Sequence, residues 1–283
     1  MDQDDIAEMA ARLAAVDGVV GVVLGGSRAR GEQRPDSDWD FGVYYRGAPH
    51  LPTLRSLARG LSESPVEVAG PGEWGPWVNG GAWLRIGGEH VDWILRDLDR
   101  VRGVWSQCRE GVFEVGIQPN HPLGFWSPCY VGELALGRVI ADPDRELTGF
   151  QQEAAGYPEP LRRSLVRAAW EAEFTVGNAA KPALRGDVLL VSLALSRSIG
   201  ILVQSLYAWH RRWCLNEKGA LAVAESLPGT PPDFGPRARR LLGAPGSTPD
   251  ELAETVRSAS ALVAEVRAAL ALPAPPSPAP HSD

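Results

Sequence analysis

Apolar positions in the first half of the chain follow two different periods. Residues 4–16 repeat at helical spacing, whereas the valine-rich run 19–24 and the run 39–45 are typical of buried strands. The same criteria predict helices over 53–62 and 98–109, a short strand over 66–69, and a β-hairpin whose strands, 82–86 and 90–95, join at two glycines. Residues 70–81, rich in glycine, proline and tryptophan, are predicted to form a surface loop.

The second half of the chain has helical periodicity throughout. Predicted helices cover residues 161–180, 187–213, 217–226, 236–242 and 249–271. Residues 272–283 are rich in proline and are predicted to be a disordered tail. We therefore predict an α+β fold, with a mixed β-sheet flanked by helices in a domain over residues 1–149 and an α-helical bundle over residues 150–271.

The segment 188–209 is apolar enough to be considered as a membrane span. It carries Arg197 and Gln204 near its middle, and inserting an arginine there costs roughly 3 kcal/mol. We therefore interpret it as a buried helix of the bundle, capped by Asp187, and predict no membrane contact.

Charge and cysteine content narrow the class of protein. The net charge of −7 disfavours a protein that binds bulk nucleic acid or an anionic membrane. Cys108, Cys129 and Cys214 are far apart and form no CxxC pair, which excludes a disulfide framework or a zinc ribbon. The acidic first residues differ from a secretory signal, and together these features predict a cytoplasmic protein.

Charge is also divided along the chain. Residues 1–149 hold 14 Lys and Arg against 22 Asp and Glu, residues 150–243 hold 12 against 8, and residues 244–283 hold 2 against 5, so the three parts carry −8, +4 and −3. An active site between a cation-binding lobe and a lobe facing an anionic ligand would produce this asymmetry, although chance could produce it as well.

The most informative stretch of the sequence is residues 25–40, between the first two predicted strands. Glycines at a strand-to-helix turn let the backbone approach a ligand closely, and the helix start with the Ser27 hydroxyl offers donors to an anion. Asp38 and Asp40 follow at the start of a strand, where period two places both carboxylates on one face, suited to hard cations. A phosphate site beside two carboxylates provides the groups that Mg²⁺-dependent chemistry on a nucleoside triphosphate requires.

A third carboxylate lies within the second strand of the predicted hairpin. Asp92 has apolar neighbours in mid-strand, and a buried charge there requires a cation as partner. If this strand lies beside the strand of Asp38 and Asp40, the three carboxylates converge into a site for two metal ions. Asp97 and Asp99 are the competing acids, and they are better placed to open the next helix.

The pattern Gly-Gly-Ser-x-Ala-Arg-Gly at residues 25–31, followed by Ser-Asp-x-Asp at residues 37–40, resembles the signature of the DNA polymerase β-like nucleotidyltransferase superfamily. Asp92 fits the third acidic position, so the resemblance covers residues 19–96. A catalytic domain followed by a helical bundle is similar to the bacterial antibiotic nucleotidyltransferases that act on aminoglycosides and lincosamides. In the bundle the resemblance rests on this layout and on residues 216–219, Asn-Glu-Lys-Gly.

The resemblance implies a nucleotidyltransferase catalytic domain over residues 1–149. It implies that Gly26 and Ser27 hold the triphosphate and that Asp38, Asp40 and Asp92 are the catalytic residues that hold magnesium, with two ions expected. The reaction so implied transfers a nucleoside monophosphate, AMP from ATP in the first instance, to a hydroxyl of a small-molecule acceptor such as an aminoglycoside-like antibiotic. Pyrophosphate is released.

Further basic residues are candidates for contacts to the nucleotide. Arg28 and Arg30 follow the turn at residues 25–27, and either could contact a phosphate or simply be an exposed helix arginine. Lys218 is the lysine best placed in the sequence to reach the triphosphate from the bundle, and the alternative is a solvated lysine at a helix end. The heptad-spaced polar residues of the long helix either line a cleft or form salt bridges inside the bundle; they are Arg197, Gln204 and Arg211.

Other residues are weaker candidates for contacts with the acceptor. A general base would be a carboxylate near the domain junction, and the candidates are Glu133, Asp142 and Glu146. Three tryptophans beside the hairpin could border the acceptor site or simply pack against the protein; they are Trp74, Trp77 and Trp83.

Two other functions are compatible with the sequence. The same chemistry could modify a protein or tRNA, as in toxin or antitoxin nucleotidyltransferases, although the negative charge disfavours a nucleic-acid partner. Alternatively, the chain could be a nucleotide-binding module without turnover, but such a module has no need of three metal carboxylates. The sequence leaves the oligomeric state open, and a homodimer is one option.

Overall fold

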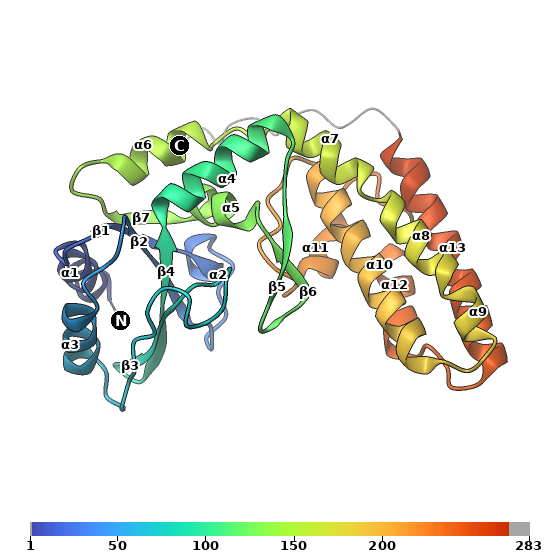
Figure 1. Cartoon of the computed structure of the whole chain (residues 1–283), viewed down its shortest axis with the longest axis horizontal. Helices are drawn as coiled ribbons and strands as arrows, with labels where there is room; N and C mark the ends of the chain where they lie inside the picture. Colours follow the sequence, from blue (N-terminus) through green and yellow to red (C-terminus); the bar gives the residue numbers. More distant parts are fainter. Residues whose placement is uncertain (1, 272–283) are drawn as a thin grey trace. The chain divides into compact units, whose positions relative to one another are not determined.

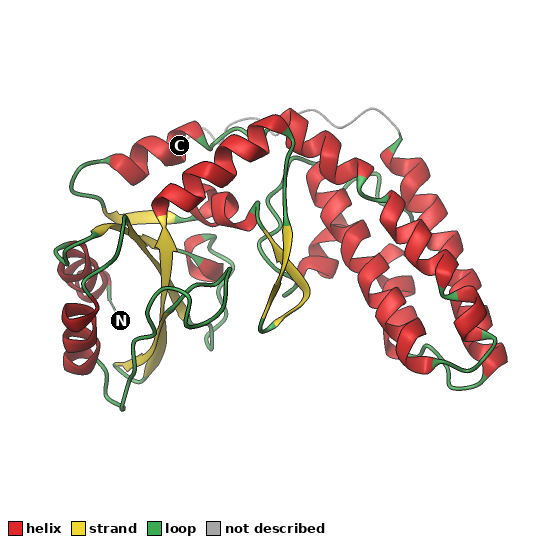
Figure 2. Ribbon diagram, in the orientation of Figure 1, coloured by secondary structure: helices red, strands yellow, loops and turns green. Residues whose placement is uncertain are grey.

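The computed structural model describes residues 2–271, and the chain divides into two compact units. The first comprises Met1–Gln107 and Phe113–Gly156, and the second comprises Cys108–Val112 and Tyr157–Asp283. The first unit combines sheet and helices, and the described part of the second contains helices without strands, as Figures 1 and 2 show. The α+β fold is therefore confirmed.

The first unit is built on a five-stranded mixed sheet in the order β3-β4-β2-β1-β7. Its strands are β1 (Val19–Leu24), β2 (Trp39–Tyr45), β3 (Gly81–Ile86), β4 (Glu89–Asp97) and β7 (Arg138–Ala141). β2 and β4 are parallel, and the other neighbouring pairs are antiparallel. β3 and β4 form the predicted hairpin, which turns at Gly87 and Gly88 with positive φ at both residues.

Six helices and a second small sheet complete this part of the chain. The helices are α1 (Gln3–Ala14), α2 (Gly26–Ala29), α3 (Leu51–Leu61), α4 (Leu98–Glu110), α5 (Cys129–Leu136) and α6 (Glu146–Glu153), and the small sheet pairs β5 (Val115–Gln118) with β6 (His121–Trp126). α4 continues into the segment that belongs to the second unit. Asp2 and Asp5 form a reciprocal capping box that fixes the start of α1.

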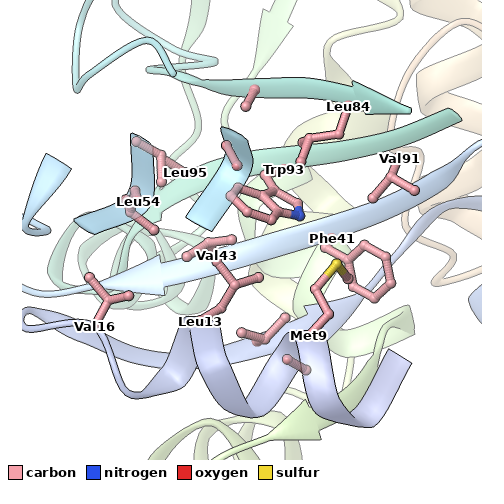
Figure 3. Close-up of a cluster of buried hydrophobic side chains, with 14 of the residues drawn as sticks. Met9, Leu13, Val16, Phe41, Val43, Leu54, Leu84, Val91, Trp93 and Leu95 are labelled. Atoms are coloured by element: carbon pink, nitrogen blue, oxygen red, sulfur yellow. The ribbon is translucent and has the colours of Figure 1, made fainter. Parts of the chain in front are cut away.

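One face of the sheet forms the hydrophobic core with α1 and α3 (Figure 3). Alternate residues of β2 and β4 point into it, including Phe41, Val43 and Trp93, and they pack near Leu13 of α1 and Leu54 of α3. Because side chains alternate across a strand, the residues between these apolar positions lie on the opposite face. That opposite face carries Asp40 and Asp92, so burial of the core orients the candidate site.

Part of the opposite face is closed by a buried ion pair. Arg96 of β4 is 3% exposed and donates to both carboxylate oxygens of Glu133 in α5, at 2.6 and 2.8 Å. Burial alone would lower the pKa of Arg96, but the Glu133 carboxylate more than offsets this and raises it. Arg96 also donates to the Val78 carbonyl, which ties the loop before β3 to the sheet.

Two local predictions were wrong. Residues 66–69 form no strand, because only Ala69 makes a bridge, to Gly81, before the chain turns away at Gly70 and Pro71. The helix predicted over 161–180 is interrupted at residues 168 and 169, which separate α7 (Glu159–Arg167) from α8 (Trp170–Asn178).

The second unit is a bundle arranged around one long helix, α10 (Val188–Trp209). Its other helices are α7, α8, α9 (Ala180–Ala183), α11 (Ala220–Ser226), α12 (Phe234–Gly243) and α13 (Pro249–Leu270). Asp187 caps α10 by accepting from Leu190 N at 3.0 Å, as predicted. Arg197 pairs with Glu171 of α8, and Arg211 pairs with Glu159 of α7, so these two residues of the predicted stripe form salt bridges within the bundle.

Among residues 2–271, α10 is the one helix long and apolar enough to cross a membrane. Half of its most apolar stretch is buried, and it packs against α7, α8 and α13. A core helix of a soluble bundle has these properties too, so the finding is weak evidence for a span. The predicted tail, 272–283, lies outside the described residues.

Candidate functional site

The candidate site begins with the register of two parallel strands. β2 and β4 lie side by side, which is the condition stated above for the acidic residues to converge. Asp40 is the register partner of Asp92. Residues paired in this way point to the same face, from strands roughly 4.8 Å apart. Both side chains are partly buried, on the face opposite the hydrophobic core. We refer to Asp40 and Asp92 as the carboxylate pair.

The turn after β1 lies directly against Asp40. We call residues 25–27 the glycine turn. Gly25 N donates to the Asp40 carbonyl at 2.7 Å, and Gly26 has φ of 63°. A Cβ on Gly26 would lie 2.8 Å from Asp40 Cγ and would meet Oδ2 even more closely. The Asp40 carboxylate therefore occupies space that exists only because residue 26 has no side chain.

Replacing Gly26 with alanine is expected to displace the Asp40 carboxylate. The substitution also places alanine in the left-handed region, which costs on the order of 1 kcal/mol. Gly31→Ala is the matched control, because Gly31 has φ of 68° but open space around the added Cβ. We expect similar losses of unfolding free energy in both variants. In the nucleotidyl transfer that the sequence predicts, pyrophosphate release should fall at least about tenfold only in Gly26→Ala. Equal activity of the two variants would contradict the steric role of Gly26.

Ser27 lies in the short helix that opens at the glycine turn. α2 is a single turn of four residues, so it contributes the backbone N–H groups of a helix start rather than a long dipole. Gly26 and Ser27 are both partly buried in α2, which follows the end of β1, and β1 neighbours the strand of Asp40. The structure thus brings together Gly26, Ser27, Asp40 and Asp92.

Asp38 differs from the carboxylate pair. It precedes β2 by one residue, in the loop between α2 and β2, and its side chain is exposed. Within residues 2–271, no three acidic, histidine or cysteine side chains gather closely enough to hold a metal ion. The three predicted ligands therefore do not form a preassembled cluster, and the predicted role of Asp38 in metal binding stays a prediction.

Arg28 contacts the loop that carries Asp38. Its guanidinium donates to the carbonyls of Ser37 (2.7 and 3.1 Å) and Asp38 (3.2 Å), and it lies 4.0 Å from the ring centroid of Trp39. It also forms an ion pair with Glu89 at 3.6 Å, and Glu89 accepts from the Trp39 indole at 2.8 Å. These contacts give Arg28 a role in holding the loop, and its predicted contact with nucleotide stays a prediction.

The remaining predicted residues have other surroundings. Lys218 is exposed in the loop before α11 of the second unit, and its contact with nucleotide stays a prediction. The three candidate bases all have structural partners: Glu133 pairs with Arg96, Asp142 accepts from backbone and side chain of Thr148, and Glu146 pairs with Arg46.

Trp83 extends the site toward the edge of the sheet. It lies on β3, where it is the register partner of Asp92, so its indole shares the face of the carboxylate pair. Trp83 is 66% exposed, and its ring stacks on Trp74 with centroids 4.3 Å apart and planes 15° apart. Trp77 instead packs against Phe125 in the interior of the first unit.

Sequence reasoning missed the residues that hold the loop of Trp74. The Gln118 carboxamide accepts from the backbone N–H groups of Trp77 and Val78 and donates to the Trp74 carbonyl. Asn79, with φ of 78°, accepts from Gly72 N and donates to the Tyr45 hydroxyl. The Asn-Gly dipeptide at 79–80 was a turn signal, but nothing local marks Gln118 as its partner.

Comparison with known proteins supports part of the predicted function. The family model for the nucleotidyltransferase domain matches residues 6–73, which include the glycine turn and Asp40 but end before Asp92. A second model, Domain of unknown function (DUF4037), matches residues 130–218. The first match supports the resemblance to the nucleotidyltransferase superfamily, whereas the narrower resemblance to antibiotic-modifying enzymes stays a prediction.

Comparison with whole proteins gives no close relative. No curated protein sequence matches this chain. Solved structures that match include a nucleotidyltransferase-like protein from Exiguobacterium sibiricum 255-15, with 11% sequence identity and a TM-score of 0.47 over 95% of this chain and 77% of that one. At this level the similarity carries no argument about function.

Proposed function

We propose that the chain is a Mg²⁺-dependent nucleotidyltransferase that transfers AMP from ATP to a hydroxyl of a small-molecule acceptor. The observation that carries the proposal is the register of Asp40 with Asp92 beside the glycine turn. Two carboxylates on one sheet face suit hard cations, and a helix start with close backbone access suits phosphate. The nucleotidyltransferase-domain match over residues 6–73 supports nucleotide transfer in general.

In this proposal the glycine turn binds the triphosphate through the backbone N–H groups of Gly26 and Ser27 and the Ser27 hydroxyl. The acceptor oxygen forms a bond to the α-phosphorus while the bond from that phosphorus to the bridging oxygen breaks. Pyrophosphate then leaves with the electron pair, and the hydroxyl proton passes to water. The protein orients the two substrates and stabilises the negative charge at the reacting phosphate, and it takes little part in covalent bond formation itself.

The residues at the site fit a magnesium requirement through their donor chemistry. Asp40 and Asp92 would hold the ion from adjacent strands, and Asp38 would join them from the preceding loop. Bound Mg²⁺ would supply neutralisation of charge at the α-phosphate and a lower pKa for the acceptor hydroxyl. The close approach of Gly26 to the Asp40 carboxylate supports a ligand role for that residue, because it keeps the carboxylate beside the proposed phosphate site.

A pyrophosphate-release screen tests the proposal directly. The full chain is incubated with MgCl₂ and each of the four nucleoside triphosphates, against a panel of aminoglycosides, lincosamides and simple hydroxyl compounds, and against cell extract. We expect release with ATP that depends on an acceptor and stops when EDTA is added. Labelling of a protein or tRNA band by α-labelled ATP would instead favour a macromolecular acceptor. Nucleotide binding without pyrophosphate release from any mixture would favour a binding module and overturn the enzyme assignment.

A further inference from the structure

We propose that Trp74 and Trp83 form a stacking platform that binds a planar ring of the acceptor. The position of the platform follows from the strand register: Trp83 is opposite Asp92, which is opposite Asp40, so the three side chains share one face on three adjacent strands. The identification of the bound molecule as the acceptor rests on the function proposed above. The existence of a ring-binding platform does not.

The exposure of Trp83 is the first argument for a bound ligand. A tryptophan can bury more apolar surface than most side chains, yet Trp83 is 66% exposed although it stacks on Trp74. Flat aromatic faces stack favourably on other flat rings, and stacking tolerates many ring types. A planar ring that stacks on the exposed part of the Trp83 indole would extend the existing pair.

The second argument is that the platform is held in place before any ligand binds. The ring of Trp74 lies over Gly81, where an added Cβ would be 2.9 Å from Cζ3, so the strand leaves room for the indole. The buried Gln118 side chain accepts from two backbone N–H groups of this loop and donates to the Trp74 carbonyl. Ordering a loop in advance removes an entropic cost of binding.

The third argument concerns which substrate reaches the platform. Across the sheet, the order is the glycine turn after β1, Asp40 on β2, Asp92 on β4 and Trp83 on β3. At about 4.8 Å per strand, the platform lies roughly 14 Å from the strand that leads into the glycine turn. Attacking and leaving oxygens are roughly in line in phosphoryl transfer. If pyrophosphate leaves over the glycine turn, the acceptor approaches from the side of β3 and Trp83.

A binding experiment tests the platform without any turnover. Saturation-transfer NMR compares benzyl alcohol with cyclohexylmethanol, which carry the same hydroxymethyl group on a planar and a puckered ring. We expect the benzyl alcohol signal to fall at least about threefold in Trp83→Leu and to persist in Trp83→Phe, which keeps a flat ring. Trp170→Leu is the matched control, since Trp170 is 57% exposed on α8 of the second unit. Equal signals from the two probes, or an unchanged signal in folded Trp83→Leu, would overturn the platform.

A kinetic experiment then tests the assignment to the acceptor. With an acceptor found in the pyrophosphate screen, Trp83→Leu is expected to raise the KM for acceptor about tenfold and leave the KM for ATP unchanged. Trp83→Phe should recover most of this loss. A raised KM for ATP with an unchanged KM for acceptor would assign the platform to the nucleotide and overturn the inference, whereas an absence of turnover in the wild-type chain counts against the proposed function alone.

Discussion

Asp40→Asn is expected to reduce pyrophosphate release by about 1000-fold while the protein remains folded. The substitution keeps the shape of the side chain but removes one negative charge from the carboxylate pair, so the site holds a divalent cation and the reacting phosphate less well. Folding should be retained, because asparagine has nearly the same size and shape as aspartate. Release is measured with saturating ATP and acceptor, and folding by circular dichroism and thermal unfolding.

The control for this variant is Asp36→Asn, which removes an exposed carboxylate from the loop before β2, two residues before Asp38. It removes the same single negative charge from the region and leaves the carboxylate pair unchanged. We expect its activity to stay within about twofold of wild type. Full activity of Asp40→Asn would contradict the assignment of Asp40 as a metal ligand. Equal losses of pyrophosphate release in Asp40→Asn and Asp36→Asn would show that the effect comes from the overall charge of the region.

Glu133→Ala is expected to destabilise the first unit by about 3 kcal/mol, because it leaves the buried guanidinium of Arg96 without its carboxylate. A loss of that size corresponds to a fall of roughly 8 °C in the unfolding temperature of a unit of this size. The measurement is thermal unfolding followed by circular dichroism. Glu146→Ala is the comparison, since the side chain of its partner Arg46 is 44% exposed, against 3% for Arg96, and exposed pairs contribute about 1 kcal/mol or less.

The double variant Arg96→Met with Glu133→Leu separates charge from packing. Replacing a buried ion pair with apolar side chains of similar size is often close to neutral, so we expect it to recover much of the stability lost in Glu133→Ala. The same variant loses the bond from Arg96 to the Val78 carbonyl, which holds the loop of Trp74. A double variant as unstable as Glu133→Ala would show that the loss comes from packing or from this loop and not from an unpaired charge.

Several elements were predictable because their signals are local. The valine-rich run of β1, the alternation in β2 and the glycine pair between β3 and β4 each determine a strand or turn within a few residues. The glycine turn and the aspartates of residues 38–40 were recognisable for the same reason, since their spacing lies within one loop between two strands. The capping role of Asp187 is also a local effect.

Elements that depend on distant partners were not predictable. β7 has only four residues. It is an edge strand of the sheet because it pairs with β1, which lies more than a hundred residues earlier in the chain. The strand expected over 66–69 fails for the converse reason, since its neighbour β3 offers it only one bridge. The surroundings of Arg28 likewise depend on the folded chain, which places Ser37, Trp39 and Glu89 around its guanidinium.

The sequence alone predicts the chemistry of the candidate site, because glycine, serine and aspartate at that spacing suit phosphate and hard cations whatever the rest of the fold. Only the tertiary structure decided which of these groups meet. The parallel register of β2 and β4 places Asp40 beside Asp92 and leaves Asp38 in an exposed loop, and the hairpin then adds Trp83 to the same face. Strand register is set by packing of the opposite, apolar face against α1 and α3, which local sequence does not encode.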